Sequence, residues 1–142
     1  MSCAPGGEIP YMFEDESLRD EALAAASAFS KPEGNKRLAL IGDAALRLVL
    51  YMHGYARGWS TEQMSDLQSK IVGTNDNLIL VGFRRGLDRR IRPNPAQNCV
   101  ERRLMATTMD AIIGAVYIDS GEDIVVTRQF IMDLGLLSGL PR

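Results

Sequence analysis

The segment NKRLALIGDAAL, residues 35–46, joins an apolar helical pattern to a glycine and an acid in its interior. From Asn35 to about Ala56, apolar residues recur at spacings of three and four: Leu38, Ile41, Ala45, Leu46, Val49 and Met52. This spacing predicts a long helix that is apolar on more than one side and therefore central in the fold. Gly42 costs such a helix about 1 kcal/mol relative to alanine, so we expect it to mark a close contact between helices or to leave room for a neighbouring side chain.

A second segment, ATTMDAIIG at residues 106–114, repeats this combination, with Asp110 among apolar residues and Gly114 four positions later. An aspartate in apolar surroundings needs a cation, a hydrogen-bond donor or water. Asp43 and Asp110 could therefore meet and hold a divalent metal ion through oxygen ligands. The alternative from the residues alone is structural, with the acids capped or paired with Arg37 or Arg47.

The remaining periodic segments also predict helices, which makes the expected fold all-α. They cover residues 15–29, 60–71, 75–86, 101–119 and 121–134. Ser60 is the expected N-cap of the second of these, with Gln63 as its partner in a capping box. Residues 91–98 hold two prolines and predict irregular structure. We expect a flexible tail over residues 1–12 and one domain over residues 13–142.

Composition excludes some classes of protein. A hydrophobic share of 46% and a charged share of 24% are typical of a soluble globular domain, and no apolar run is long enough to span a membrane. The isolated Cys3 and Cys99 indicate a reducing, intracellular compartment, whether cytoplasmic, nuclear or mitochondrial. The net charge is −2, but the arginines at 84, 85, 89, 90, 92, 102 and 103 form a local basic strip. Such a strip suits either phosphate contact or a solvated surface.

The two glycine–acid segments resemble the signatures of the ribonuclease III family. The first signature reads roughly NERLEFLGDAVL and matches at Asn35, Arg37, Leu38, Gly42, Asp43, Ala44 and Leu46. The second reads roughly ADxxEAxIGAxYxD and matches at Ala106, Ala111, Ile113, Gly114, Ala115, Tyr117 and Asp119, with Asp110 as a conservative change. Weaker similarity in the segments around Ala22 and around Met64 keeps the same order. The resemblance therefore runs from about residue 13 to 125.

This resemblance implies an α-helical dimer that cuts double-stranded RNA in a valley between its subunits. Each subunit of such an enzyme supplies four carboxylates, two from each signature, which bind divalent metal. The metal ions activate water and stabilise the leaving oxygen in phosphodiester hydrolysis. The resemblance assigns Asp43 and Asp110 as the catalytic and metal-binding residues of this chain.

The chain departs from the family at most of these acidic positions. In the first signature, the first glutamate falls on Lys36 and the second, at a metal-binding position, falls on Ala39. In the second signature, the aspartate falls on Thr107 and the glutamate is shortened to Asp110. Asp43 alone is unchanged among the four metal-binding positions. Two carboxylates balance the charge of one divalent ion, so we expect at most one Mg²⁺ or Mn²⁺ per site.

The resemblance also assigns residues to RNA and to the dimer. Gln68 and Lys70 lie where the family places polar residues near RNA, and Arg84 and Arg85 add cations. Leu40 replaces the aromatic residue that the family uses as a knob in its dimer interface. The alternatives are a solvated helix face for Gln68 and Lys70 and burial within one subunit for Leu40. No separate double-stranded-RNA-binding domain fits in 142 residues, so we expect affinity to rest on the valley.

These expectations lead to three functional hypotheses. The first is a ribonuclease III-type domain of RNA processing that binds double-stranded RNA as a homodimer or as a heterodimer with a related chain, with cleavage weak or lost. The second is an active, metal-dependent endoribonuclease that uses Asp43 and Asp110. The third is a structural protein, for which mitochondrial ribosomal proteins with inactive domains of this type give a precedent.

Overall fold

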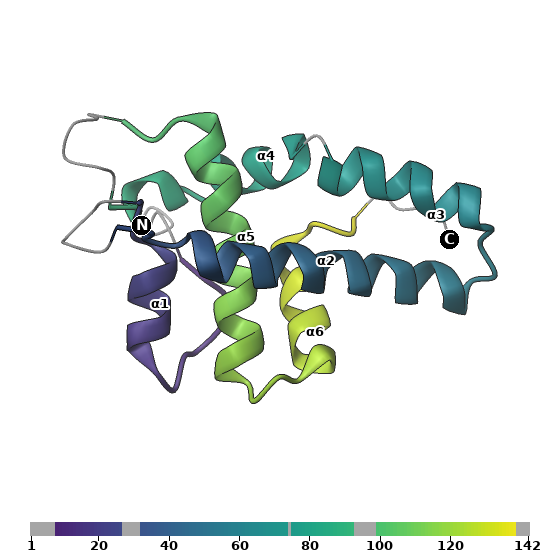
Figure 1. Ribbon diagram of the computed structural model, residues 1–142, viewed down its shortest axis with the longest axis horizontal. Coiled ribbons are helices and arrows are strands. Elements are labelled where there is room, and N and C mark those ends of the chain that lie inside the picture. The colour runs from purple at the N-terminus through teal and green to yellow at the C-terminus, as the bar shows by residue number, and fades with distance from the viewer. Residues whose placement is uncertain (1–7, 27–31, 74, 93–98, 139–142) are drawn as a thin grey trace, which may run out of the picture.

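The computed structural model describes residues 8–26, 32–73, 75–92 and 99–138. Apart from an isolated bridge between Ala24 and Arg92, regular structure in these residues is helical, which confirms the all-α prediction (Figure 1). The helices are α1 (Glu16–Ala22), α2 (Lys36–Ala56), α3 (Thr61–Gln68), the π-helix η1 (Ser69–Gly73), α4 (Asp76–Arg84), the 3-10 helix η2 (Leu87–Arg89), α5 (Arg102–Asp119) and α6 (Ile124–Leu134). None of them is both long and apolar enough to cross a lipid bilayer.

The centre of the fold is the crossing of α2 and α5, which make the most extensive contact between any two elements (Figure 1). Met105, Met109, Ile112 and Ile113 of α5 are fully or almost fully buried, as are Leu46, Val49 and Leu50 of α2. At the crossing, a Cβ atom on Gly42 would collide with the backbone carbonyl of Asp110, and one on Gly114 with the carbonyl of Leu38. The glycines therefore permit backbone-to-backbone contact, which is the first of the two roles that the sequence left open for Gly42.

Most of the predicted helices agree with the structure. The helices predicted from Asn35, Ser60, residue 101 and residue 121 correspond to α2, α3, α5 and α6. Ser60 caps α3 as expected: its hydroxyl accepts from the Gln63 N–H at 3.1 Å, and its own N–H donates to Gln63 Oε1 at 2.8 Å. The helix predicted through Ile71 ends at Gln68 and continues as η1. Of the predicted irregular segment 91–98, residues 93–98 lie outside the described part of the chain.

The first predicted helix is shorter than its composition suggests. We expected it to run from residue 15 to 29, but α1 ends at Ala22, and residues 27–29 lie outside the described part of the chain. Beyond it the backbone pairs with Arg92, whose N–H donates to the Leu23 carbonyl at 2.7 Å and whose carbonyl accepts from the Ala25 N–H at 2.8 Å. These long-range hydrogen bonds replace the helical ones, so tertiary contacts override the helix propensity of the alanines.

Part of the expected N-terminal tail is packed. Residues 8–12 belong to the described part of the chain, and Ile9 and Tyr11 lie against the core. The Tyr11 hydroxyl donates to Asp119 at the end of α5 at 2.8 Å, and its ring meets Phe130 edge-on. Burial and this hydrogen bond to a carboxylate raise the pKa of Tyr11 to about 12. The apolar body and polar tip of the tyrosine explain why this segment is fixed.

We expect Gly42→Ala to destabilise the fold far more than Gly82→Ala. Both glycines are buried in helices, but a Cβ on Gly42 meets the α5 backbone, whereas one on Gly82 meets the flexible side chain of Met105. Overpacking a core costs about 1–3 kcal/mol, and a backbone obstacle places Gly42→Ala at or above that upper end. Chemical denaturation measures the difference. Equal losses in the two variants would contradict the close helix contact.

Candidate functional site

Asp43 and Asp110 lie on either side of the α2–α5 crossing. Asp43 follows Gly42, whose α-carbon faces the Asp110 backbone, so the fold brings the two predicted acids to one place. The Asp43 side chain is 34% exposed and forms an ion pair with Arg47 Nε, 3.3 Å from its Oδ2. The ion pair with Arg47 is the structural alternative that the sequence left open for Asp43.

Asp110 occupies a different environment from Asp43. It is buried on α5, and its Oδ1 has no hydrogen-bond partner among the described residues. Burial, reinforced by the negative charge of Asp43 and opposed by Arg47, raises the pKa of Asp110 to about 7. At neutral pH this carboxyl group therefore exists in both its protonated and its ionised form.

The donor atoms at this crossing do not fit a centre for two metal ions. No group of three or more His, Cys, Asp or Glu side chains in the described residues is placed to hold a metal. Ala39 and Thr107, which the resemblance places at two acidic positions, carry no charge. Arg47 already compensates Asp43, and Asp110 resists ionisation. Two carboxylates in this state supply too little negative charge for a pair of divalent ions.

The four predicted RNA-binding residues do not form one cluster. Gln68 ends α3 and Lys70 is exposed on η1, whereas Arg84 and Arg85 lie at the other end of α4. Arg84 is exposed to solvent. Arg85 is half-buried, and its Nη2 donates to the Asp133 carbonyl at 2.6 Å, which ties α4 to the end of α6. Arg85 therefore has a structural contact in addition to its predicted role.

Leu40, the predicted dimer residue, projects from α2 into solvent with 75% of its surface exposed. It stands at the edge of a cavity of about 390 Å³ between α1, α2 and α5, which is lined by Leu18, Glu21, Arg37, Leu38, Leu40, Ile41 and Ile118. Leu48, Tyr51 and Tyr55 continue an exposed apolar stripe along the same helix. Burial of Leu40 within one subunit, the alternative left open by the sequence, is therefore excluded for this conformation.

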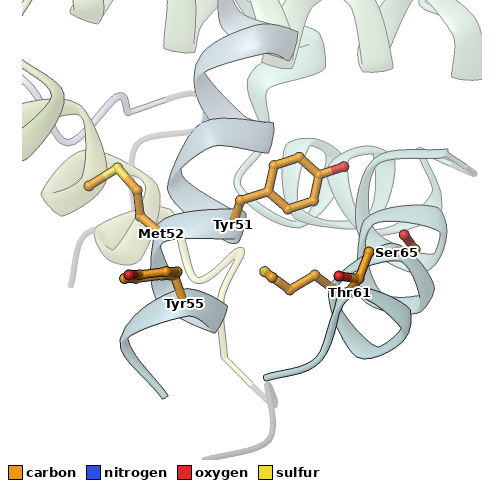
Figure 2. A pocket seen from close by; sticks show the side chains of 6 residues that line it. Tyr51, Met52, Tyr55, Thr61 and Ser65 are labelled. Atoms are coloured by element: carbon orange, nitrogen blue, oxygen red, sulfur yellow. The ribbon is translucent and has the colours of Figure 1, made fainter. Parts of the chain in front are cut away.

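A larger apolar cavity of about 590 Å³ lies between α2 and α3. Figure 2 shows the side chains of Tyr51, Met52 and Tyr55 projecting from α2 and those of Thr61 and Ser65 from α3. Among the described residues that line it, the tyrosines are the only titratable groups, so this lining has the character of a contact surface. The sequence did not identify it, because its lining comes from two helices whose packing the pattern leaves open.

A third cavity, of about 220 Å³, lies at the first turns of α2 and α5, and its wall combines apolar side chains with polar and charged ones. Lys36, Arg103, Glu101, Asn35 and Thr107 contribute to this wall. The sequence marked Lys36 and Thr107 as lost acids, but it could not show that they share a cavity with Arg103.

Comparison with known proteins places this chain in a family. Residues 36–121 match the sequence model described as the ribonuclease III domain. The protein named Ribonuclease 3 from Vibrio vulnificus is 31% identical over 132 residues, which are 89% of this chain and 56% of that protein. Ribonuclease 3 from Pseudomonas aeruginosa is 31% identical over 122 residues, 82% of this chain and 52% of that protein. The chain spans about half the length of the curated relatives it matches.

Solved structures agree with the fold. Two structures of the nuclease domain of ribonuclease III from Campylobacter jejuni have TM-scores of 0.81 and 0.75 to this chain, at 23% and 24% identity. Each covers 94% of this chain, and 94% and 92% of the respective solved chains are matched. The description of the first structure names a region involved in dimer formation of that nuclease domain.

We expect Asp110→Asn to stabilise the fold at about pH 8.5 and to have little effect at about pH 5. The folded-state pKa is raised to about 7 from 3.8, so the folded chain holds a proton that the unfolded chain releases. The free energy of unfolding then falls as pH rises from about 4 to 7. Above this window the buried charge costs at most about 4 kcal/mol, since one pKa unit is about 1.4 kcal/mol, and asparagine avoids that cost.

Thermal denaturation at both pH values measures the effect of this substitution. The control is Asp66→Asn, which removes an exposed acid on α3 and should change stability little at either pH. A gain for Asp110→Asn that does not depend on pH would show that the carboxyl is not held in its protonated form.

Proposed function

Because this chain belongs to the ribonuclease III family, we propose that it binds double-stranded RNA and that its cleavage activity is weak or lost. One observation carries the second part of this proposal: just two carboxylates meet at the α2–α5 crossing, where Arg47 pairs with Asp43 and Asp110 has a pKa of about 7. Hydrolysis of a phosphodiester at a two-metal site needs the full charge of the acids that hold the ions.

The proposed RNA contacts are electrostatic and sensitive to shape. A-form RNA is recognised mainly through its phosphates, its 2′-hydroxyls and the form of its grooves. Lys70 and Arg84 are exposed cations that suit such contacts, and Gln68 offers a neutral donor two residues before Lys70. Arg85 keeps further N–H groups for a phosphate while it donates to Asp133. Binding of this kind depends on salt and little on sequence.

At most one Mg²⁺ or Mn²⁺ would bind between Asp43 and Asp110. A bound divalent ion supplies attraction for a phosphate oxygen and a more acidic water molecule. In this chain the ion would have to displace Arg47 from Asp43 and the proton from Asp110, and both exchanges weaken its affinity. The proposal therefore predicts weak metal binding that tightens as pH rises.

We propose that the functional form is a dimer, either with a second copy or with a related chain. Leu40 is an exposed leucine next to an apolar cavity of about 390 Å³. Under a two-fold axis, the Leu40 side chain of each subunit could enter the cavity of the other, as an isologous interface requires. The exposed stripe of Leu48, Tyr51 and Tyr55 would extend this contact.

An active nuclease is the second candidate. The observation that favours it is the survival of Asp43 and Asp110 at one place, since a buried, unpartnered carboxyl is costly and a protein without use for it gains stability by losing it. A chain that neither binds nor cuts duplex RNA would instead fit the structural role.

We expect the triple variant Ala39→Glu, Thr107→Asp, Asp110→Glu to cut duplex RNA at least tenfold faster than the unchanged chain. It restores the family's four acids on the faces that meet at the crossing. Clustered acids repel one another, so the variant should be less stable without metal and regain stability with Mg²⁺. Gel analysis of a labelled duplex measures cleavage, and calorimetry with and without Mg²⁺ measures stability.

Adding Asp43→Asn to the triple variant is the control and should abolish the restored cutting. Fast, metal-dependent cleavage by the unchanged chain would refute the proposal of weak or lost activity. If the folded triple variant binds duplex and Mg²⁺ but never cuts, the missing acids do not explain the loss.

We expect Leu40→Glu to convert the dimer to a monomer. The new carboxylate would lose its water in the apolar interface and find no partner charge there. The interface that it disrupts is expected to bury about 1,200 Å² or more in total, as stable dimers do. Val125→Glu is the matched control, because Val125 is 59% exposed on α6, away from the Leu40 cavity. Sedimentation at tens of micromolar measures the oligomeric state of both variants. A monomer for the unchanged chain would contradict a homodimer and leave the heterodimer to be tested with a related chain.

A further inference from the structure

The cavity of about 220 Å³ at the first turns of α2 and α5 carries more positive than negative charge. Among the described residues of its wall, Lys36 and Arg103 are the cations and Glu101 is the one acid. Four arginines elsewhere form ion pairs with acids: Arg19, Arg47, Arg92 and Arg102. Lys36 and Arg103 have no such pair within the described part of the chain, so their charges are available to a ligand.

Buried hydrogen bonds fix the frame of this cavity. Asn35 is buried, and its Nδ2 donates to the Ala22 carbonyl and to Thr108 Oγ1, both at 2.9 Å. These bonds hold the start of α2, which carries Lys36, against the end of α1 and against the second turn of α5, one turn beyond Arg103. The wall also offers the Thr107 hydroxyl and the Asn35 Oδ1, an acceptor with no partner among the described residues. A polar ligand therefore meets prepared groups here.

The charges along the crossing change sign from one end to the other. On α2, Lys36, Ala39 and Asp43 follow at spacings of three and four; on α5, Arg103, Thr107 and Asp110 do the same. Cations thus occupy one end of the crossing and acids the middle. Without a metal ion, a phosphate is repelled by the acids and attracted to the cationic end.

From this arrangement we infer that Lys36 and Arg103 bind a phosphate group of duplex RNA without a metal ion. The inference rests on the proposed RNA binding and specifies where and how it occurs. A lysine stands where the resembling signature has a glutamate, so this end of the crossing carries a positive charge in place of a negative one, and the ammonium attracts phosphate directly. The guanidinium of Arg103 adds paired N–H donors to phosphate oxygens. Neither group activates water, which agrees with binding in place of cleavage.

The test measures binding of a fluorescent RNA duplex to the full chain in EDTA and in Mg²⁺. The variants are Lys36→Gln, Arg103→Gln and the double change. We expect the unchanged chain to bind equally in both buffers, within about twofold. The double variant should bind at least tenfold more weakly, and each single change should lower the slope of log affinity against log salt by about one.

The matched control removes two cations elsewhere, with Arg57→Gln at the end of α2 and Arg128→Gln on α6. It should change affinity less than twofold, although the net charge changes equally. All variants should keep the melting temperature of the unchanged chain, because Lys36 and Arg103 are exposed. Binding that needs Mg²⁺, or a double variant that binds as well as the control, would overturn the inference.

Inorganic phosphate separates this inference from the proposed function. If the unchanged chain binds no duplex, the proposed function fails, and the cavity is judged by phosphate titration alone. Amide resonances of Lys36, Arg103 and Thr107 should then shift with phosphate in the unchanged chain and remain still in the double variant. No shift in the unchanged chain would overturn the cavity as a phosphate site.

Discussion

The backbones of α2 and α5 touch at Gly42 and Gly114, and the rest of the structure is arranged around this contact. Side chains larger than hydrogen at these positions would hold the helices apart. The close approach buries the middle of α5, with every residue from 108 to 116 buried, and brings the residues flanking both glycines together. Asp43 and Asp110 are therefore close because the two helix backbones meet at the glycines. The charge interactions between these acids are thus a result of how the helices pack.

The same contact explains why the two aspartates differ although both sit next to apolar residues in the sequence. Asp43 lies on the rim of the crossing, where Arg47, one turn away on the same helix, reaches it. Asp110 lies inside, where burial makes the ionised form costly. A metal site requires both acids to be charged at once. The environment of this pair works against that requirement, while the cationic cavity beside it needs no such ionisation.

Structural features that depend on residues near each other in the sequence were predicted from the sequence. The spacing of apolar residues gave α2 and α5, Ser60 and Gln63 gave the start of α3, and Gly42 indicated the close crossing. Where α1 ends could not be predicted, because Arg92 closes that backbone from far along the sequence. The pairing of Asp43 with Asp110 was anticipated, but their unequal exposure was not. The cavity that joins Lys36 to Arg103 depends on the crossing angle, which periodicity does not encode.

The long helix α2 has two environments, so parts of the molecule differ in the free energy that local unfolding requires. Its earlier residues, including Leu46, Val49 and Leu50, pack in the core, whereas beyond Gly54 its neighbour is α3, which buries no residue at all. Amide hydrogens of α3 can exchange with solvent by separation of this hairpin alone, without global unfolding. The seam that opens is the cavity beside Tyr51 and Tyr55. Whatever occupies that seam would slow exchange in α3 and leave the rate in α5 unchanged.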